Sequence, residues 1–246
     1  MTKTLILIPS RMAATRLPGK PLLKINNLSI ISHVFKKAEE ANIGEVVVAT
    51  DDQEILKDVI QNGGKAILTN KNHKTGTDRI YEAYEKLDIK NIDYILNLQG
   101  DEPDINKDDI INLNNLMIDQ DAELGTLAAK IKNDEMFNNK NVVKVITDKK
   151  LEESNFPIAL NFTRDNLLTD YQNIYHHIGI YSYKTSILKK FIGLEQTINE
   201  KKNKLEQLRA LDNKLKINVA LAKFSPIGVD TEQDYLAIKK IMEYKI

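Results

Sequence analysis

Several features are scarce or missing in this 246-residue sequence, and each absence excludes a class of function. The chain has no cysteine, which excludes disulfides, thiolate zinc sites and cysteine nucleophiles. It has no net charge either, because 35 Lys and Arg residues balance 35 Asp and Glu residues. Without a basic excess there is no global electrostatic reason to expect binding to nucleic acid or to a membrane surface.

Long apolar runs are also missing. The run Leu5–Ile8 near the N-terminus ends at once at Pro9, so it is too short for the core of a signal peptide and far too short to cross a bilayer. We therefore expect a cytoplasmic protein without a membrane-inserted segment. No repeat, low-complexity tract or flexible linker divides the sequence, which predicts a single domain over residues 1–246.

Strand-like and helix-like apolar patterns alternate through about residues 1–120. Runs at 5–8, 45–50, 65–69 and 93–98 predict strands, and apolar residues at helical spacing between them predict helices. This order predicts an α/β fold whose central sheet is mostly parallel and has helices on both faces. Ser29 is a candidate N-cap, whereas the pair Asp51-Asp52 fits either helix capping or a contact with a ribose.

The alternation weakens after Asp119. Runs at 124–131, 142–146, 156–162, 174–183 and 215–224 predict further strands, with a short helical stretch at Leu205–Arg209 before the last of them. We therefore expect a nucleotide-binding half over about 1–120 and a smaller α+β extension over about 121–246. In the strand at 174–183, His177 and Tyr181 are expected on one face.

The loop from Pro9 to Pro21 follows the first predicted strand and carries three cations, Arg11, Arg16 and Lys20. A loop at the carboxyl end of a parallel strand is where open α/β sheets bind ligands, and guanidinium and ammonium groups suit a polyphosphate. The alternative interpretation is a solvated basic turn. Gly19-Lys20 precedes a proline, so this is not a Walker A motif, and G-x-G-x-x-G is absent.

Two acidic residues follow predicted strands. Asp101 comes after the run at 93–98, and Asp230 comes after the run at 215–224. Mg²⁺ prefers one or two carboxylates together with phosphate oxygens and water, so Asp101, ahead of its neighbour Glu102, is the best candidate for a metal ligand. Each aspartate also fits a simple turn or helix cap.

The basic loop and five later segments resemble, in order, the sugar-acid cytidylyltransferases, in particular the 3-deoxy-manno-octulosonate (Kdo) cytidylyltransferase family. The later segments are His73–Arg79, Asn97–Pro103, His177–Tyr181, Leu205–Arg209 and Gly228–Thr231. The resemblance extends over nearly the whole chain. It implies a Rossmann-like nucleotidyltransferase fold and transfer of CMP from CTP to Kdo with release of pyrophosphate, which activates Kdo for lipopolysaccharide synthesis. It also implies a homodimer packed by the extension.

The resemblance assigns roles to individual side chains. The catalytic residues would be Arg11, Lys20, Asp101 and Asp230, the last two as ligands of Mg²⁺. The nucleotide would be bound by Arg11, Arg16, Lys20, Thr75, Gly76, Thr77 and Arg79. The sugar acid would be bound by Gln99, Arg164, His177, Tyr181, Glu206 and Gln207. By residue type alone, the 75–79 segment would be an ordinary helix cap, His177 a core or surface histidine, and Glu206 part of a solvated helix face.

One segment departs from the family pattern. Thr163-Arg164 keeps a hydroxyl and a cation, but the usual Ile-Pro beyond them is missing, which puts the shape of the loop after Arg164 in doubt. Two alternatives stay open at this point: the same reaction on an 8-amino Kdo analogue or a sialic acid, or a catalytically silent nucleotide-binding regulator. The intact Lys20, Asp101 and Asp230 argue against the regulator.

Overall fold

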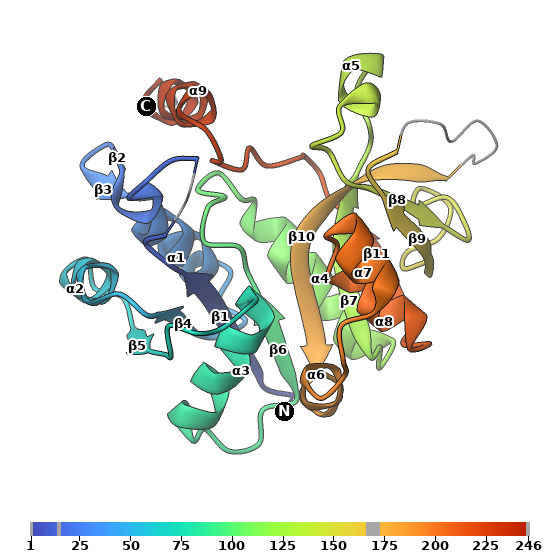
Figure 1. The fold of residues 1–246 in the computed structure, drawn as a ribbon, viewed down its shortest axis with the longest axis horizontal. Helices are drawn as coiled ribbons and strands as arrows, with labels where there is room; N and C mark the ends of the chain where they lie inside the picture. The colour runs from blue at the N-terminus through green and yellow to red at the C-terminus, as the bar shows by residue number, and fades with distance from the viewer. Residues whose placement is uncertain (1, 14–15, 166–172, 245–246) are drawn as a thin grey trace. The chain divides into compact units, whose positions relative to one another are not determined.

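The computed structural model describes residues 2–13, 16–165 and 173–244 and divides the chain into two compact units (Figure 1). Unit 1 comprises Met1–Ile110 and Pro226–Ile246, and unit 2 comprises Ile111–Ser225. The chain therefore returns to unit 1 after building unit 2, a return that the sequence pattern did not indicate.

Unit 1 is built on parallel strands. They are β1 (Thr4–Ser10), β4 (Gly44–Thr50), β5 (Ala66–Leu68) and β6 (Tyr94–Asn97), in the order β6-β1-β4-β5 with parallel pairing throughout. Leu5–Ile8 in β1 have no exposed surface, as expected for a strand covered on both faces. The predicted α/β class with a mainly parallel sheet is confirmed.

The helices of unit 1 follow from the strand order. They are α1 (Ile30–Glu40), α2 (Gln53–Gln61), α3 (Gly76–Leu87), α9 (Glu232–Glu243) and the short 3₁₀ helix η1 (Lys20–Leu22), with a small hairpin of β2 (Lys24–Ile25) and β3 (Leu28–Ser29). The steps β1 to β4 and β4 to β5 run in one direction, so right-handed crossovers place α1 and α2 on one face. The step from β5 back to β6 runs the other way, which places α3 on the opposite face. The sheet's carboxyl ends therefore have their topological switch point between β1 and β6, where open α/β sheets bind ligands.

Helix caps in unit 1 match the sequence in part. The Ser29 side chain accepts from Ser32 N–H, which confirms the predicted start of α1, and Asp52 caps α2. Asp51 has a different partner, because its carboxylate pairs with Arg79 at 3.1 Å. Of the two aspartates, only the second is a helix cap.

The C-terminal segment is held in unit 1 by a hydrogen bond and by an apolar cluster. Val229 N–H donates to the carbonyl of Asp101 at 2.9 Å. Val229 and Ile238 are fully buried together with Ile25 and Ile30. Covering these side chains provides the main driving force for docking α9.

Unit 2 carries a mixed sheet. Its strands are β7 (Leu124–Ala129), β8 (Lys144–Thr147), β9 (Ala159–Thr163), β10 (Ile174–Lys184) and β11 (Ile217–Leu221), in the order β11-β7-β10-β8-β9. The β11–β7 pair is parallel, and the other pairs are antiparallel. The helices are α4 (Lys107–Asp119), which begins in unit 1, then α5 (Asp134–Asn138), α6 (Thr185–Ile192), α7 (Ile198–Asn203) and α8 (Gln207–Asp212). Within the described part of the chain, no helix is long and apolar enough to span a membrane.

Candidate active site

The loop after β1 directs Lys20 inward. Gly19 has a φ of +71°, a left-handed conformation that favours glycine, and η1 begins directly after it with Pro21 in its first turn. The Lys20 side chain is only 13% exposed, and its Nζ donates to Asp101 Oδ2 at 2.6 Å and to Asp230 Oδ1 at 3.3 Å. One ammonium group therefore lies between two carboxylates.

The two aspartates reach Lys20 from distant parts of the sequence. Asp101 follows β6, and Asp230 precedes α9 on the C-terminal segment. Arg16 also pairs with Asp230, since its Nη2 lies 3.1 Å from Asp230 Oδ2. The structure thus brings together four of the residues that the sequence predicted for phosphate and metal binding, and Arg11 lines the same cavity.

Glu102 lies beside this cluster in a different state. Its Oε2 is buried and has no hydrogen-bond partner in the described structure. Burial, followed by the charges of Asp101 and Asp230, raises the pKa of Glu102 to about 8. Glu102 is therefore mostly protonated at neutral pH, and the negative charge of the site belongs to the two aspartates, in keeping with the preference for Asp101 over Glu102.

A cavity of about 360 Å³ opens at this cluster, entirely within unit 1. This volume lies in the range of small-molecule sites, and the cavity occupies the switch point between β1 and β6. Its lining includes the predicted residues Arg11, Arg16, Lys20, Thr75, Gly76, Arg79, Gln99, Asp101 and Asp230. His73 and Lys74, which were not among the predicted site residues, also line it. They lie in a segment whose resemblance was noted, so their position directly before Thr75 was the available signal.

Two glycines allow backbone segments to meet at Pro9. A Cβ at Gly100 would lie 2.9 Å from the Pro9 carbonyl oxygen and 3.1 Å from Ile31 Cδ1, and a Cβ at Gly76 would lie 3.1 Å from Pro9 Cγ. The chain after β1, the chain after β6 and the start of α3 are therefore packed closely enough to form one wall.

Gly100→Ala is expected to lower the free energy of unfolding by about 1–3 kcal/mol, because the added methyl group meets a backbone oxygen that cannot turn away. Urea denaturation measures the effect. Gly193→Ala is the matched control, because its Cβ would meet nothing closer than 3.5 Å and its φ of −76° is ordinary. Equal stability of the two variants would contradict the close packing at Pro9.

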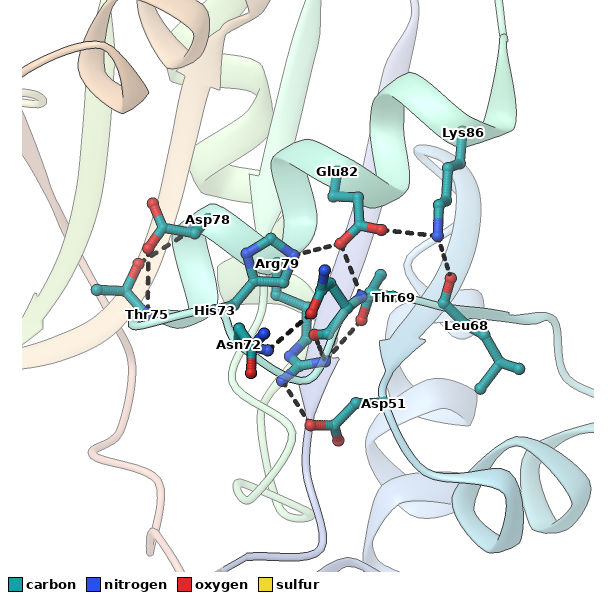
Figure 2. Close-up of polar contacts among 11 residues, drawn as sticks. Asp51, Leu68, Thr69, Asn72, His73, Thr75, Asp78, Arg79, Glu82 and Lys86 are labelled. Atoms are coloured by element: carbon teal, nitrogen blue, oxygen red, sulfur yellow. Dashed lines mark hydrogen bonds and ion pairs between the residues drawn. The ribbon is translucent and has the colours of Figure 1, made fainter.

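The start of α3 is fixed by a reciprocal cap. Thr75 Oγ1 accepts from Asp78 N–H at 3.1 Å, and Asp78 Oδ2 accepts from Thr75 N–H at 3.2 Å (Figure 2). Thr77, predicted to bind nucleotide, is 2% exposed and does not line the cavity. Arg79 touches the cavity, but its guanidinium donates to Thr69, to the carbonyl of Asn70 and to Asp51 (Figure 2).

In unit 2, the structure brings His177 and Tyr181 together. The Tyr181 hydroxyl and the Thr126 hydroxyl lie 2.9 and 3.1 Å from His177 Nε2, and Phe162 packs edge-on against the imidazole. The β10 register shifts between Ile178 and Tyr181, yet the two side chains remain neighbours as expected from their common face. Burial, followed by His176 and Arg164, lowers the pKa of His177 to about 3, and burial raises the pKa of Tyr181. Both side chains are therefore uncharged at neutral pH.

The depressed pKa of His177 makes stability dependent on pH. Below about pH 6.5 this histidine is protonated in the unfolded chain but stays neutral in the folded protein. The free energy of unfolding therefore falls as the pH drops towards 3, by at most about 1.4 kcal/mol per pH unit from this group. His177→Gln should reduce this slope in urea titrations at pH 6, 5 and 4, and part of the remaining slope comes from His176, whose pKa burial lowers to about 4. At pH 8 the histidine is neutral in both states, so any difference there reports the packing and the hydrogen bonds to Thr126 and Tyr181. An unchanged slope would show that His177 is protonated in the folded protein.

The other predicted sugar-acid residues of unit 2 have partners of their own. Arg164 donates to the carbonyls of Lys140 and Asn141 at 3.3 and 2.9 Å. The segment after it, where the sequence departs from the family pattern, includes residues 166–172, which lie outside the described residues. Glu206 contributes electrostatically to the raised pKa of Tyr181, so it belongs to the same neighbourhood.

The start of α8 is held by a buried ion pair. Arg209 donates to both carboxylate oxygens of Glu200 at 2.9 and 2.6 Å, and both residues are 3% exposed. The Nη2 of Arg209 also donates to Glu206 Oε1 at 3.4 Å. Gln207 is 9% exposed. The solvated helix face that residue type alone suggested for this segment is therefore found only in part, since Gln207 and Arg209 are buried while the Glu206 side chain is 29% exposed.

The comparisons with known proteins agree with this geometry. The Cytidylyltransferase family profile matches residues 5–217. A 3-deoxy-manno-octulosonate cytidylyltransferase of Rhodopseudomonas palustris (strain BisB18) is 43% identical over 99% of this chain and 99% of its own length. The enzyme of the same name from Thermodesulfovibrio yellowstonii is 43% identical over 97% of this chain and 98% of its own length. The chain belongs to the 3-deoxy-manno-octulosonate cytidylyltransferase family.

Solved structures support the same family and fold. A CMP:2-keto-3-deoxy-manno-octonic acid synthetase complexed with CTP has a TM-score of 0.90, with 33% identity and complete coverage of both chains. A UDP-glucose pyrophosphorylase has a TM-score of 0.73 at 13% identity, which shows the fold alone. The predicted Rossmann-like nucleotidyltransferase fold is confirmed, as is membership of a family of nucleotidyltransferase enzymes.

Proposed function

We propose that this protein transfers CMP from CTP to the anomeric hydroxyl of Kdo, releasing pyrophosphate. The observation that carries the proposal is the 43% identity, over nearly the full length, to relatives named 3-deoxy-manno-octulosonate cytidylyltransferase. In this reaction the anomeric oxygen of Kdo forms a bond to the α-phosphorus of CTP. The bond between the α-phosphorus and the oxygen that bridges it to the β-phosphorus breaks, and the hydroxyl proton is released. No covalent protein intermediate is required, so catalysis rests on positioning and on neutralising charge.

Unit 1 is assigned to CTP. Arg11, Arg16 and Lys20 supply positive charge along one cavity, which suits the triphosphate and the pyrophosphate that leaves. Thr75 and Gly76 line the same cavity at the start of α3, where the positive end of the helix dipole favours anions. Thr77 and Arg79 support this wall from within the protein.

A divalent metal, Mg²⁺, fits the acidic pair. Asp101 and Asp230 already converge on a cation, the Lys20 ammonium, and all their donors are the oxygens that Mg²⁺ prefers. No group of three or more acidic, histidine or cysteine side chains suited to a metal occurs among the described residues. This matches an ion that takes one or two carboxylates and completes its shell with phosphate and water. When bound, Mg²⁺ would neutralise charge on the phosphates.

Unit 2 is assigned to the sugar acid. His177 and Tyr181 are uncharged at neutral pH, so they suit hydrogen bonds to hydroxyl groups. The charged candidates are Arg164, for the carboxylate, and Glu206, for hydroxyls, while Gln207 offers an amide. Gln99, also assigned to the sugar acid, lines the unit 1 cavity. We further propose that the enzyme acts in the cytoplasm as a homodimer.

The test is pyrophosphate release with CTP, Mg²⁺ and Kdo, run beside the 8-amino analogue and a sialic acid. We expect release with Kdo that depends on both CTP and the metal, with little release from UTP or ATP. Release with a different acid only would keep the reaction but move the specificity, and the segment after Arg164 would be the first place to search. CTP binding without release from any acid would favour the silent regulator.

A further inference from the structure

The loop Asn70–Thr75 forms part of the cavity and is held largely by residues outside it. Within the loop, Asn72 N–H donates to Asn70 Oδ1 at 2.9 Å. The loop connects β5 to α3, and its sequence, N-K-N-H-K-T, contains no apolar side chain. His73, Lys74 and Thr75 line the cavity. A polar surface loop holds one conformation only where hydrogen bonds fix it, because ordering each residue costs conformational entropy. Its anchors therefore decide where these cavity-lining groups lie.

One carboxylate, that of Glu82 on α3, supplies anchors at two points of the loop. Glu82 Oε2 accepts from Asn70 N–H at 2.8 Å, and it also contacts His73 Nε2 (Figure 2). Its other oxygen pairs with Lys86 at 2.7 Å. Burial alone would raise the pKa of Glu82, but the hydrogen bonds from Lys86, Asn70 and His73 lower it to about 2. The Glu82 carboxylate is therefore charged at neutral pH.

Arg79 fixes the origin of the same loop. It lies one helical turn before Glu82, so both side chains leave α3 on neighbouring positions of one face. Its Nη1 donates to Thr69 Oγ1 at 2.6 Å and to the carbonyl of Asn70 at 3.4 Å, and its Nη2 pairs with Asp51 at 3.1 Å. Figure 2 shows the guanidinium turned towards Thr69 and Asp51. The positive charge of Arg79 is thus paired with Asp51, directly after β4, while its neutral partners Thr69 and Asn70 follow β5.

We propose that Glu82 is a positioning residue for the nucleotide: it clamps the Asn70–Thr75 loop so that His73, Lys74 and Thr75 face the CTP cavity, while Arg79 holds the loop's first residue. The proposal rests on the proposed function, because it takes the ligand of this cavity to be CTP. Neither residue needs to touch the nucleotide. Loss of the clamp should affect CTP far more than the sugar acid, because the loop belongs to unit 1.

The test compares Glu82→Ala with Glu85→Ala. Both substitutions replace a glutamate of α3 with alanine. Glu85 is exposed, and among its described hydrogen bonds it accepts only from the Tyr81 hydroxyl. CTP affinity is measured by calorimetry without sugar acid, the two KM values by pyrophosphate release, and loop order by hydrogen exchange at Asn70. For Glu82→Ala we expect CTP affinity to fall roughly 10- to 100-fold, with the KM for Kdo within about twofold of wild type. The Asn70 amide should exchange faster, and Glu85→Ala should match wild type in every measurement.

Three results would overturn the proposal: CTP affinity of Glu82→Ala equal to wild type, an equal rise in both KM values, or unchanged exchange at Asn70. If Glu82→Ala does not fold, Glu82→Met against Glu85→Met decides in the same way, because methionine has a similar length but lacks the oxygens that accept from Asn70 N–H and contact His73. Turnover by the wild-type protein tests the proposed function separately. The ratio of variant to wild-type CTP affinity tests the clamp, even if none of the acids tried is turned over.

Discussion

Asp101→Asn is expected to lower kcat on the order of a thousandfold, which corresponds to several kcal/mol of lost charge stabilisation, while the protein still folds. Asparagine keeps the size of the side chain but removes the charge that faces Lys20 at 2.6 Å. Of the two aspartates, only Asp230 would remain to bind a cation. The measurement is pyrophosphate release at saturating CTP and Kdo over a series of Mg²⁺ concentrations.

Asp108→Asn is the matched control for this variant. Asp108 is exposed in the first turn of α4, so the same chemical change there should leave turnover near wild type. Thermal unfolding of both variants separates loss of the site from loss of the fold. Near-normal turnover of Asp101→Asn at saturating Mg²⁺ would remove Asp101 from the metal site.

Lys20→Ala is expected to reduce kcat/KM for CTP by about 10²–10³-fold, comparable to removing one preorganised donor from a transition state. The ammonium is held at 13% exposure between two carboxylates, so its position is set before CTP arrives. Its removal also leaves the Asp101 carboxylate without its cation and Asp230 with Arg16 alone, and the added negative charge opposes the approach of a triphosphate. Steady-state kinetics with varied CTP at saturating Kdo measure the effect.

Lys24→Ala serves as the comparison, because Lys24 is exposed in β2, just beyond η1. It should respond to CTP as the wild type does. If Lys20→Ala did the same, the loop after β1 would not bind the phosphates. A larger change in the KM for Kdo than for CTP would move Lys20 to a different part of the reaction.

The order of strands and helices in the first half of the chain was predictable because continuous apolar runs alternate there with apolar residues at helical spacing. The short apolar run Leu5–Ile8 ends at Pro9, which favours a strand, and Ser29 directly precedes apolar residues at helical spacing, which favours a helix start. Asp101 could be placed near the basic loop, because the carboxyl ends of parallel strands lie at one edge of a sheet. Such inferences need only local sequence and the handedness of crossovers.

The partners of buried charges were not predictable. Arg79 had the residue type and the motif of a nucleotide ligand, but no sequence pattern shows that Asp51, 28 residues earlier, takes its charge. Glu82 carried no signal, since a glutamate on a helix is usually solvated. Likewise, Arg209 and Glu200 form a buried pair across two short helices that lack the length to produce a clear period.

The return of residues 226–246 to unit 1 has a consequence for the newly made chain. Lys20 and Asp101 are synthesised early, but Asp230 and the helix that covers Ile25 and Ile30 leave the ribosome only after the whole of unit 2. Protein units usually fold in the order of their synthesis, yet unit 1 stays unfinished until translation reaches its last segment. A nascent chain therefore carries half of its acidic pair, with part of an apolar core uncovered, and acquires a complete CTP site only when unit 2 is already built.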